Sequence, residues 1–221
     1  MSRYVLRLYA DTLAAKTALP AALPAGKRII YVREGSATLR SAGQVMTLAA
    51  NSAWSAPTPC EVLAGGAGAQ LLRWELDGTA GATALVTGEG VQSRLLTEAQ
   101  LDLDFPDGLL FRCDRVDFPP GGIAYTHTHQ GPGIRCLLAG GLTVETTGHA
   151  TAIAPGEAWF EAGADPVLAT AWNESASGFV RVMVLPRALK GKSSICYVKP
   201  EDQQKPKPQQ YQIFVDEFID P

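Results

Sequence analysis

Short runs of β-prone, mostly apolar residues recur along most of this chain and are separated by turns that contain glycine or proline. Short β-prone runs that are bounded by such turn residues are typical of strands. Many short strands at regular spacing are typical of a sandwich or barrel. We therefore predict an all-β protein, with its clearest strands at residues 28–33, 36–39, 44–48, 53–55, 134–138, 142–146, 150–153 and 158–161.

An internal repeat organises these strands into two copies. When the first half is shifted by 105 residues, glycines at two turns and a tryptophan coincide with their counterparts. The coinciding pairs are Gly35 with Gly140, Gly43 with Gly148, and Trp54 with Trp159. Such spacing indicates a duplicated structural unit.

The repeat predicts how the domains divide. A Gly/Ala/Thr-rich stretch between the copies is expected to be a linker, and the one helical signal follows it at residues 95–105, with Thr97 as the N-cap candidate. We expect a first copy at 1–80, a linker at 81–107, a second copy at 108–186 and a separate tail at 187–221. Within the tail, residues 211–219 form a strand-like run that we expect to pack on a barrel or on a dimer partner.

The second copy contains two of the three histidines, His127 and His129. Residues two apart on a strand point to the same face, so both imidazoles can converge on one point, as metal ligands must. A histidine pair inside a barrel can also be hydrogen-bonded without any metal, and that alternative stays open.

The spacing around this pair resembles the first motif of the cupin superfamily (RmlC-like proteins). That motif is a glycine, five residues, H-x-H, three or four residues, a glutamate, six residues and a glycine. Here Gly121, the histidine pair, Gly133 and Gly140 keep every spacing, and Gly133 stands in the glutamate position. The resemblance implies two double-stranded β-helix (jelly-roll) barrels in tandem, with a degenerate N-terminal copy.

The resemblance also bears on the metal ligands, because two of the four that are usual in the family are missing. The family's pattern places Trp159 and Glu161 on an inward face, so Glu161 can join His127 and His129 around one divalent ion (Fe, Mn, Zn or Ni). Two histidines and a carboxylate form the facial arrangement of non-haem Fe(II) oxygenases. Glu161 can equally be the partner of Arg135, since a buried charge is costly unless it is paired.

A small anionic molecule is the expected ligand. Arg135 is predicted to point inward, and its fork of donors suits a carboxylate or phosphate. Tyr125, on the predicted face of His127, and Trp159 complete the candidate substrate-binding set, although packing alone would also explain both aromatic residues.

The first copy carries no equivalent chemistry, and we expect it to cover the second barrel or to supply the interface of a homodimer. Its residues at the positions of His127, His129, Gly133, Arg135 and Glu161 are Ala22, Pro24, Arg28, Ile30 and Ala56.

Composition excludes several classes of partner. The 221 residues are 46% hydrophobic and 19% charged with a net charge of −3, so no electrostatic footprint for nucleic acid is present. No apolar run is long enough for a membrane-spanning helix. Four scattered cysteines without a C-x-x-C pair suggest thiols in a reducing compartment, and we expect a cytoplasmic protein.

Two classes of function remain. One is a metal-dependent enzyme, of dioxygenase or isomerase type, acting on a small anionic organic molecule. The other is a small-molecule-binding or sensor protein that uses the same cavity without turnover.

Overall fold

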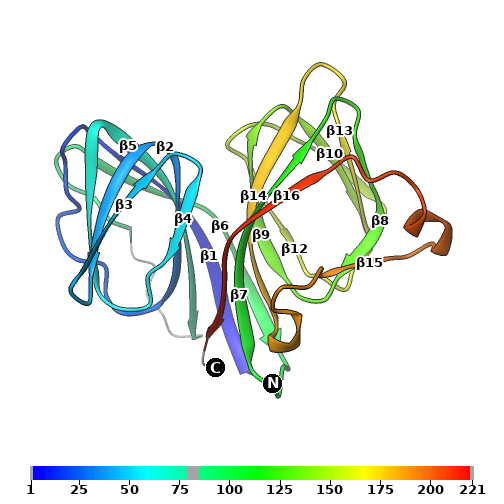
Figure 1. Cartoon of the computed structure of the whole chain (residues 1–221), viewed down its shortest axis with the longest axis horizontal. Coiled ribbons are helices and arrows are strands. Elements are labelled where there is room, and N and C mark those ends of the chain that lie inside the picture. Colours follow the sequence, from blue (N-terminus) through cyan, green and yellow to red (C-terminus); the bar gives the residue numbers. More distant parts are fainter. Residues whose placement is uncertain (1, 79–84, 220–221) are drawn as a thin grey trace. The chain divides into compact units, whose positions relative to one another are not determined.

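The computed structural model describes residues 2–78 and 85–219, which fold into two compact units (Figure 1). The first unit ends at Asp104 and the second begins at Phe105. Each unit is built almost entirely from antiparallel strands, as the sequence predicts. No helix among the described residues is long and apolar enough to cross a membrane.

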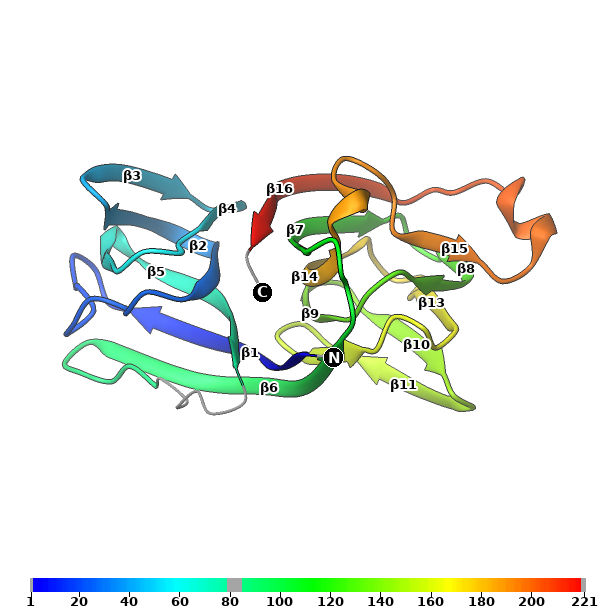
Figure 2. The ribbon, with the colours of Figure 1, turned by 90° about the horizontal axis from the view of Figure 1, so that it is seen from below.

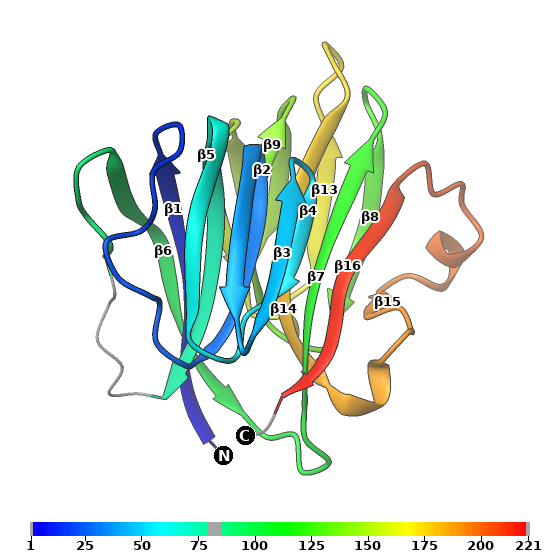
Figure 3. The same ribbon diagram turned by 60° about the vertical axis from the view of Figure 1, so that its left-hand side comes forward.

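The first unit is one six-stranded sheet with the strand order β3-β2-β5-β1-β6, and β4 pairs with β2 (Figure 3). Aliphatic side chains from β1, β2, β3, β5 and β6 make its core, with Trp54 packed against them. The strands are β1 (Ser2–Leu13), β2 (Lys27–Ser41), β3 (Gln44–Ala49), β4 (Ser52–Ser55), β5 (Cys60–Gly78) and β6 (Val91–Leu103).

Strand β6 corrects the expectation of a linker with a helical segment. Residues 91–103 pair with the whole of β1, from Leu13 opposite Val91 to Ser2 opposite Leu103. A weak local helical signal is overridden here, because pairing with a neighbouring strand satisfies the backbone and buries Val91, Leu101 and Leu103. Residues 79–84, part of which were also expected to be linker, lie outside the described residues.

The second unit has two five-stranded sheets that face each other (Figure 2). Their strand orders are β11-β10-β13-β8-β15 and β12-β9-β14-β7-β16. Apolar residues from both sheets form a shared core, which includes Val116, Leu137, Val144 and Val167. The elements are β7 (Leu109–Phe118), β8 (Ile123–His129), β9 (Gly133–Ala139), β10 (Leu142–Thr146), β11 (His149–Ile153), β12 (Ala158–Glu161), β13 (Val167–Ala171), β14 (Ser177–Pro186), η1 (Arg187–Leu189), β15 (Ile195–Tyr197), η2 (Pro200–Gln203) and β16 (Gln210–Ile219).

The two units pair their strands in the same register at a spacing of 105 residues. Ile30 lies opposite Trp54 in the first unit, and Arg135 lies opposite Trp159 in the second. The tight hairpin turns also correspond, because Gly43 and Gly148 take positive φ values of 77° and 80°, which glycine adopts at little cost.

The C-terminal tail belongs to the second unit and completes both of its sheets. Strand β15 pairs with β8, and β16 pairs with β7 along its whole length. The predicted strand at 211–219 is thus the edge strand of this chain's own barrel. Val215 is buried, while Phe218 remains partly exposed beneath the guanidinium of Arg187, 3.8 Å from its ring.

Candidate functional site

A small cavity of about 20 Å³ lies between the two sheets of the second unit, and we call it the inner cavity. His127 and His129 reach it from β8, Arg135 from β9, and Trp159 and Glu161 from β12. Five of the six predicted site residues therefore line one cavity, together with apolar side chains and Arg181 of β14. The volume is sufficient for a water molecule or a metal ion but not for an organic molecule.

Tyr125 is the predicted site residue that does not line the inner cavity. In the pairing of β8 with β13, Val167 lies opposite His127 while Ala169 lies opposite Ala124, so β8 has one residue more than its partner. This β-bulge breaks the alternation and turns Ala124 inward in place of Tyr125. The backbone of Tyr125 still serves the site, because its carbonyl accepts a hydrogen bond from His127 Nδ1 at 2.7 Å.

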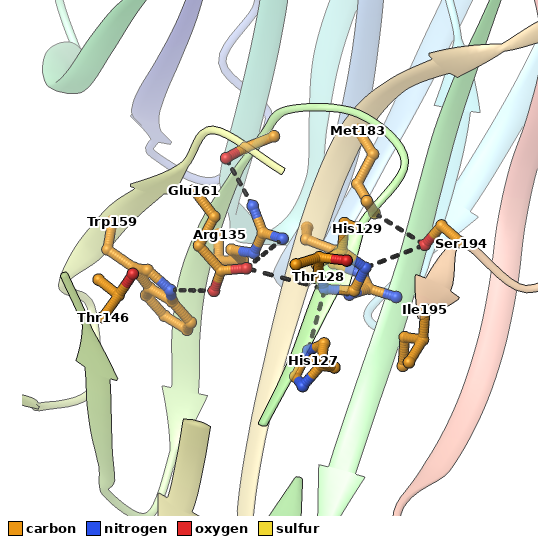
Figure 4. A network of polar contacts seen from close by, with 12 residues as sticks. His127, Thr128, His129, Arg135, Thr146, Trp159, Glu161, Met183, Ser194 and Ile195 are labelled. Carbon is orange, nitrogen blue, oxygen red and sulfur yellow. Dashed lines mark hydrogen bonds and ion pairs between the residues drawn. The ribbon is translucent and has the colours of Figure 1, made fainter. Parts of the chain in front are cut away.

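The two histidines direct their Nε2 atoms at each other, 3.3 Å apart (Figure 4). His127 Nδ1 must carry its proton because it faces a carbonyl oxygen, which leaves a lone pair on Nε2. His129 Nε2 lies 3.3 Å from Nη1 of Arg181, which can only donate, and His129 Nδ1 then donates to Ser194 Oγ at 3.1 Å. Both Nε2 lone pairs therefore point into the same small space.

The surroundings keep these imidazoles neutral. Burial lowers the pKa of His127 below its usual value. Burial also lowers the pKa of His129, well below the usual value, and the positive charges of Arg181 and Arg135 lower it further. Neutral imidazole is the form that binds metal ions.

Glu161 and Arg135 form a buried ion pair, with Oε2 and Nη2 2.6 Å apart. Neither atom makes an aligned hydrogen bond, so the contact is ionic. Arg135 also donates to the carbonyl of Gly133, and Trp159 Nε1 donates to Glu161 Oε1 at 2.8 Å. Burial, opposed by Glu161, lowers the pKa of Arg135 to about 10. The pairing that the sequence left open is thus present, and Glu161 Oε2 is 3.7 Å from His129 Nε2.

Arg181 and Ser194 are the site residues that sequence reasoning missed. The Asp114 carboxylate holds Arg181 through Nε and Nη2, at 2.6 and 3.2 Å, which leaves Nη1 for His129. The repeat carried a signal for Arg181, since Arg73 occupies the matching place in the first copy. Nothing in the sequence indicated that Ser194 of the tail returns to β8.

Gly133, in the glutamate position of the motif, lies against the backbone of β14. A Cβ atom at this position would be 2.5 Å from the carbonyl oxygen of Val182 and 2.9 Å from Cγ of Met183. The position therefore has no room for a side chain, which gives a physical reason why the usual carboxylate is absent.

The two histidines are placed to bind a metal ion, but Glu161 is not. With metal–nitrogen distances of about 2.1 Å, the 3.3 Å separation of the Nε2 atoms corresponds to a ligand–metal–ligand angle of about 104°, close to the tetrahedral value. Glu161, however, is engaged by Arg135. Within residues 2–78 and 85–219, no group of three or more His, Cys, Asp and Glu side chains is placed to hold a metal. The geometry therefore offers two protein ligands.

In the first unit, an ion cluster occupies the corresponding region. Arg73 is bound by Asp11 at 2.6 and 3.2 Å and by Glu75 at 2.7 Å, and Arg28 contacts Glu75 at 2.6 Å. All four side chains are buried, and their charges balance. Arg73 and Arg181 are each held by an aspartate on the neighbouring strand, which preserves the repeat without the histidines.

Comparisons with known proteins support the fold. No family model and no curated protein sequence matches this chain. Among solved structures, a protein from Pseudomonas aeruginosa assigned as glyoxylate induced is similar at a TM-score of 0.59 and 15% identity, covering 83% of this chain and 75% of its own. AerE from Microcystis aeruginosa is similar at 0.59 and 11%, covering 82% and 88%.

A variant of oxalate decarboxylase from Bacillus subtilis is similar at a TM-score of 0.66 and 11% identity, covering 92% of this chain and 80% of its own. A further structure of that enzyme, similar at 0.65 and 11% over 90% and 73%, concerns its Mn(II) centres. At these identities the likeness establishes architecture and no activity. The chain thus shares with these structures an all-β architecture of the double-stranded β-helix (jelly-roll) type, the type of barrel seen in cupins.

Proposed function

We propose that the second unit is a cupin centre that binds one divalent metal ion through His127 and His129 and acts on a small organic anion. In the same proposal the first unit is a second cupin barrel whose centre has been replaced by its ion cluster. Two observations support this duplication. The strand registers of the two units match, and Arg73 and Arg181, at corresponding positions, are each bound by an aspartate.

The observation that carries the proposal is the orientation of the two imidazoles. Both Nδ1 atoms are directed away from the cavity, toward Tyr125 and Ser194, and both Nε2 atoms point into it. Two lone pairs 3.3 Å apart repel each other unless a cation lies between them. Burial and the nearby arginines disfavour a proton there, so a metal ion is the cation that fits.

Neighbouring residues hold the two imidazoles in the orientation that a metal ion requires. The Tyr125 carbonyl and the Ser194 hydroxyl fix the ring orientations, as outer contacts of metal-binding histidines commonly do. Trp159 packs edge-on against Phe179, with ring centres 5.3 Å apart, and both rings line the inner cavity. When bound, the metal supplies Lewis acidity toward an oxygen of the ligand.

Metal analysis tests the proposal directly. Protein purified without chelator is expected to contain about one divalent ion per chain. His127→Ala and His129→Ala are each expected to lose it, whereas His149→Ala, which removes the exposed third histidine, retains it. Iron or manganese would support an oxygenase, and zinc or nickel would support hydrolysis or isomerisation. Absence of metal from the wild type, even after incubation with Mn²⁺ or Zn²⁺, would overturn the proposal.

A second candidate is a metal-free binding or sensor protein. The observation in its favour is that Arg181 Nη1 already lies 3.3 Å from His129 Nε2 and satisfies the lone pair that a metal requires. A metal displaces only this one long contact, because Arg181 keeps both bonds to Asp114. The same metal analysis separates the two candidates.

A further inference from the structure

A second and much larger cavity, of about 350 Å³, adjoins the inner cavity within the second unit. We call it the tail cavity, because the segment Gly191–Tyr197, Lys207 and β16 form most of its wall. Its floor comes from Arg112 and Asp114 of β7 and Arg181 of β14. Strands β15 and β16 are the edge strands of the two sheets of this unit (Figure 1).

The tail cavity is the place where an organic ligand can fit. Ligand sites are usually about 300–1,000 Å³, and the inner cavity is far below that range. Arg181, Ile195 and Tyr211 line both cavities, so a molecule in the tail cavity lies next to the residues around the histidine pair.

The charges of the tail cavity favour an anion. Its arginines are neutralised, because Asp216 binds Arg112 at 2.8 and 3.2 Å and Asp114 binds Arg181. Two further cations, Lys192 and Lys207, line the cavity. Among the described residues neither lysine has a carboxylate within ion-pair distance. A net positive charge therefore remains near the mouth.

The remaining wall is apolar and aromatic. Tyr197, Tyr211, Ile195 and Ile213 line the cavity, and Ile213 and Tyr211 are 50% and 48% exposed. Apolar side chains open to a cavity gain free energy when a ligand covers them, and tyrosine hydroxyls can hydrogen-bond to an oxyanion. The complementary ligand therefore has a charged group and an apolar or aromatic body.

Two contacts connect this cavity to the histidine pair. Ser194 lines the tail cavity and bonds His129 Nδ1, while Arg181 lines both cavities and faces His129 Nε2. Figure 4 shows Ser194 beside His129, with Ile195 next to it. A ligand that enters from the tail side thus meets the groups that orient His129 before it meets the histidines.

We propose that the tail cavity is the binding site for a small organic oxyanion, a carboxylate or phosphate on an apolar or aromatic body, with Lys192 and Lys207 as its charge-recognising residues. This inference assigns the ligand site for the proposed function and rests on that function only for the chemistry that follows binding. The recognition itself depends on the C-terminal tail of this chain.

Calorimetric titration of the full chain with benzoate, phenyl phosphate and the uncharged analogue benzamide tests the inference. Benzoate or phenyl phosphate is expected to bind about tenfold more tightly than benzamide. The variant Lys192→Ala/Lys207→Ala is expected to lose about tenfold in affinity for the anion, since each exposed charge contributes modestly. The matched control Lys190→Ala/Lys199→Ala removes the same charge from exposed tail lysines outside the cavity, and it should bind as the wild type does.

The result that would overturn the inference is benzamide binding as tightly as both anions, or a control variant that loses as much affinity as the cavity variant. Metal content, measured on the same samples, keeps the two proposals apart. Anion binding that persists in metal-free protein and in His127→Ala supports the tail cavity even if the metal proposal fails. A metal-loaded protein that prefers neither anion refutes the tail cavity alone.

Discussion

The carboxylate of Glu161 lies 2.6 Å from the guanidinium of Arg135, and both side chains are almost wholly buried. The same carboxylate is 3.7 Å from Nε2 of His129, so two roles are open to it: counter-charge of Arg135 or metal ligand. The shorter contact identifies it first as the counter-charge of an arginine that has no access to water. The consequences for stability and for metal binding can be separated by experiment.

Removal of either partner of this pair is expected to destabilise the protein. Glu161→Gln and Arg135→Met should each lower the free energy of unfolding by about 3–5 kcal/mol. The first variant leaves the buried charge of Arg135 unpaired, and the second leaves that of Glu161 unpaired. The double variant Glu161→Gln/Arg135→Met leaves neither charge unpaired and should recover much of this loss. Urea denaturation of the four proteins measures the coupling.

Metal content of the same variants distinguishes the roles of Glu161. If the carboxylate serves Arg135, Glu161→Gln retains the metal while it loses stability. A variant of normal stability that loses its metal would show instead that Glu161 is a ligand.

Substitution of Gly133 is expected to be costly because β14 leaves no room for a Cβ atom. Gly133→Ala should lower the free energy of unfolding by about 1–3 kcal/mol through overpacking. Gly66→Ala is the matched control, since a Cβ at that strand position meets nothing within 4 Å. Thermal unfolding compares them, and equal melting temperatures would contradict the predicted clash. By the same reasoning, Gly133→Glu should unfold the barrel and not complete the metal site.

Acidification is expected to destabilise the metal-free protein through the histidine pair. The pKa values of His127 and His129 are lowered in the folded state, so below about pH 6.5 the unfolded chain binds protons that the folded chain does not. Stability is therefore unaffected above that pH and falls as the pH drops below it, by at most about 2 kcal/mol per histidine at pH 5.

Denaturation in the presence of chelator, at pH 7.5 and pH 5, measures this effect. The variant His127→Gln/His129→Gln should show a smaller loss on acidification than the wild type, while His149→Gln should behave as the wild type. An identical loss in all three proteins would contradict the assigned cause.

Loss of the Ser194 hydroxyl is expected to weaken metal binding without removing a ligand. Ser194→Ala deletes the acceptor that holds the Nδ1 proton of His129, and such outer contacts are worth about 10–100-fold in metal affinity. Nitrogen-15 NMR of the imidazoles should show a shift in the His129 tautomer, and Ser193→Ala should show neither change. Unchanged tautomer populations would contradict the assignment.

Much of the fold could be predicted because its signals are local. Turn glycines with positive φ, such as Gly43 and Gly148, and the strand runs between them recur at a spacing of 105 residues. Alternation on β9 likewise predicted that Arg135 points inward, whereas the inward direction of Glu161 was predicted from the resemblance to the cupin pattern. The rule of alternation placed Tyr125 wrongly, because a single extra residue in β8 reverses every position before it.

The sequence by itself determined the β architecture, the repeat, and the pairing of two histidines on one strand face, since each depends on spacing along the chain. Only the tertiary structure decided which partners these groups meet. Arg181, Ser194 and most of the wall of the tail cavity come from segments more than fifty residues beyond His129, which β14, β15 and β16 bring back beside it. Contacts of that range depend on strand order and register, and no local pattern encodes them.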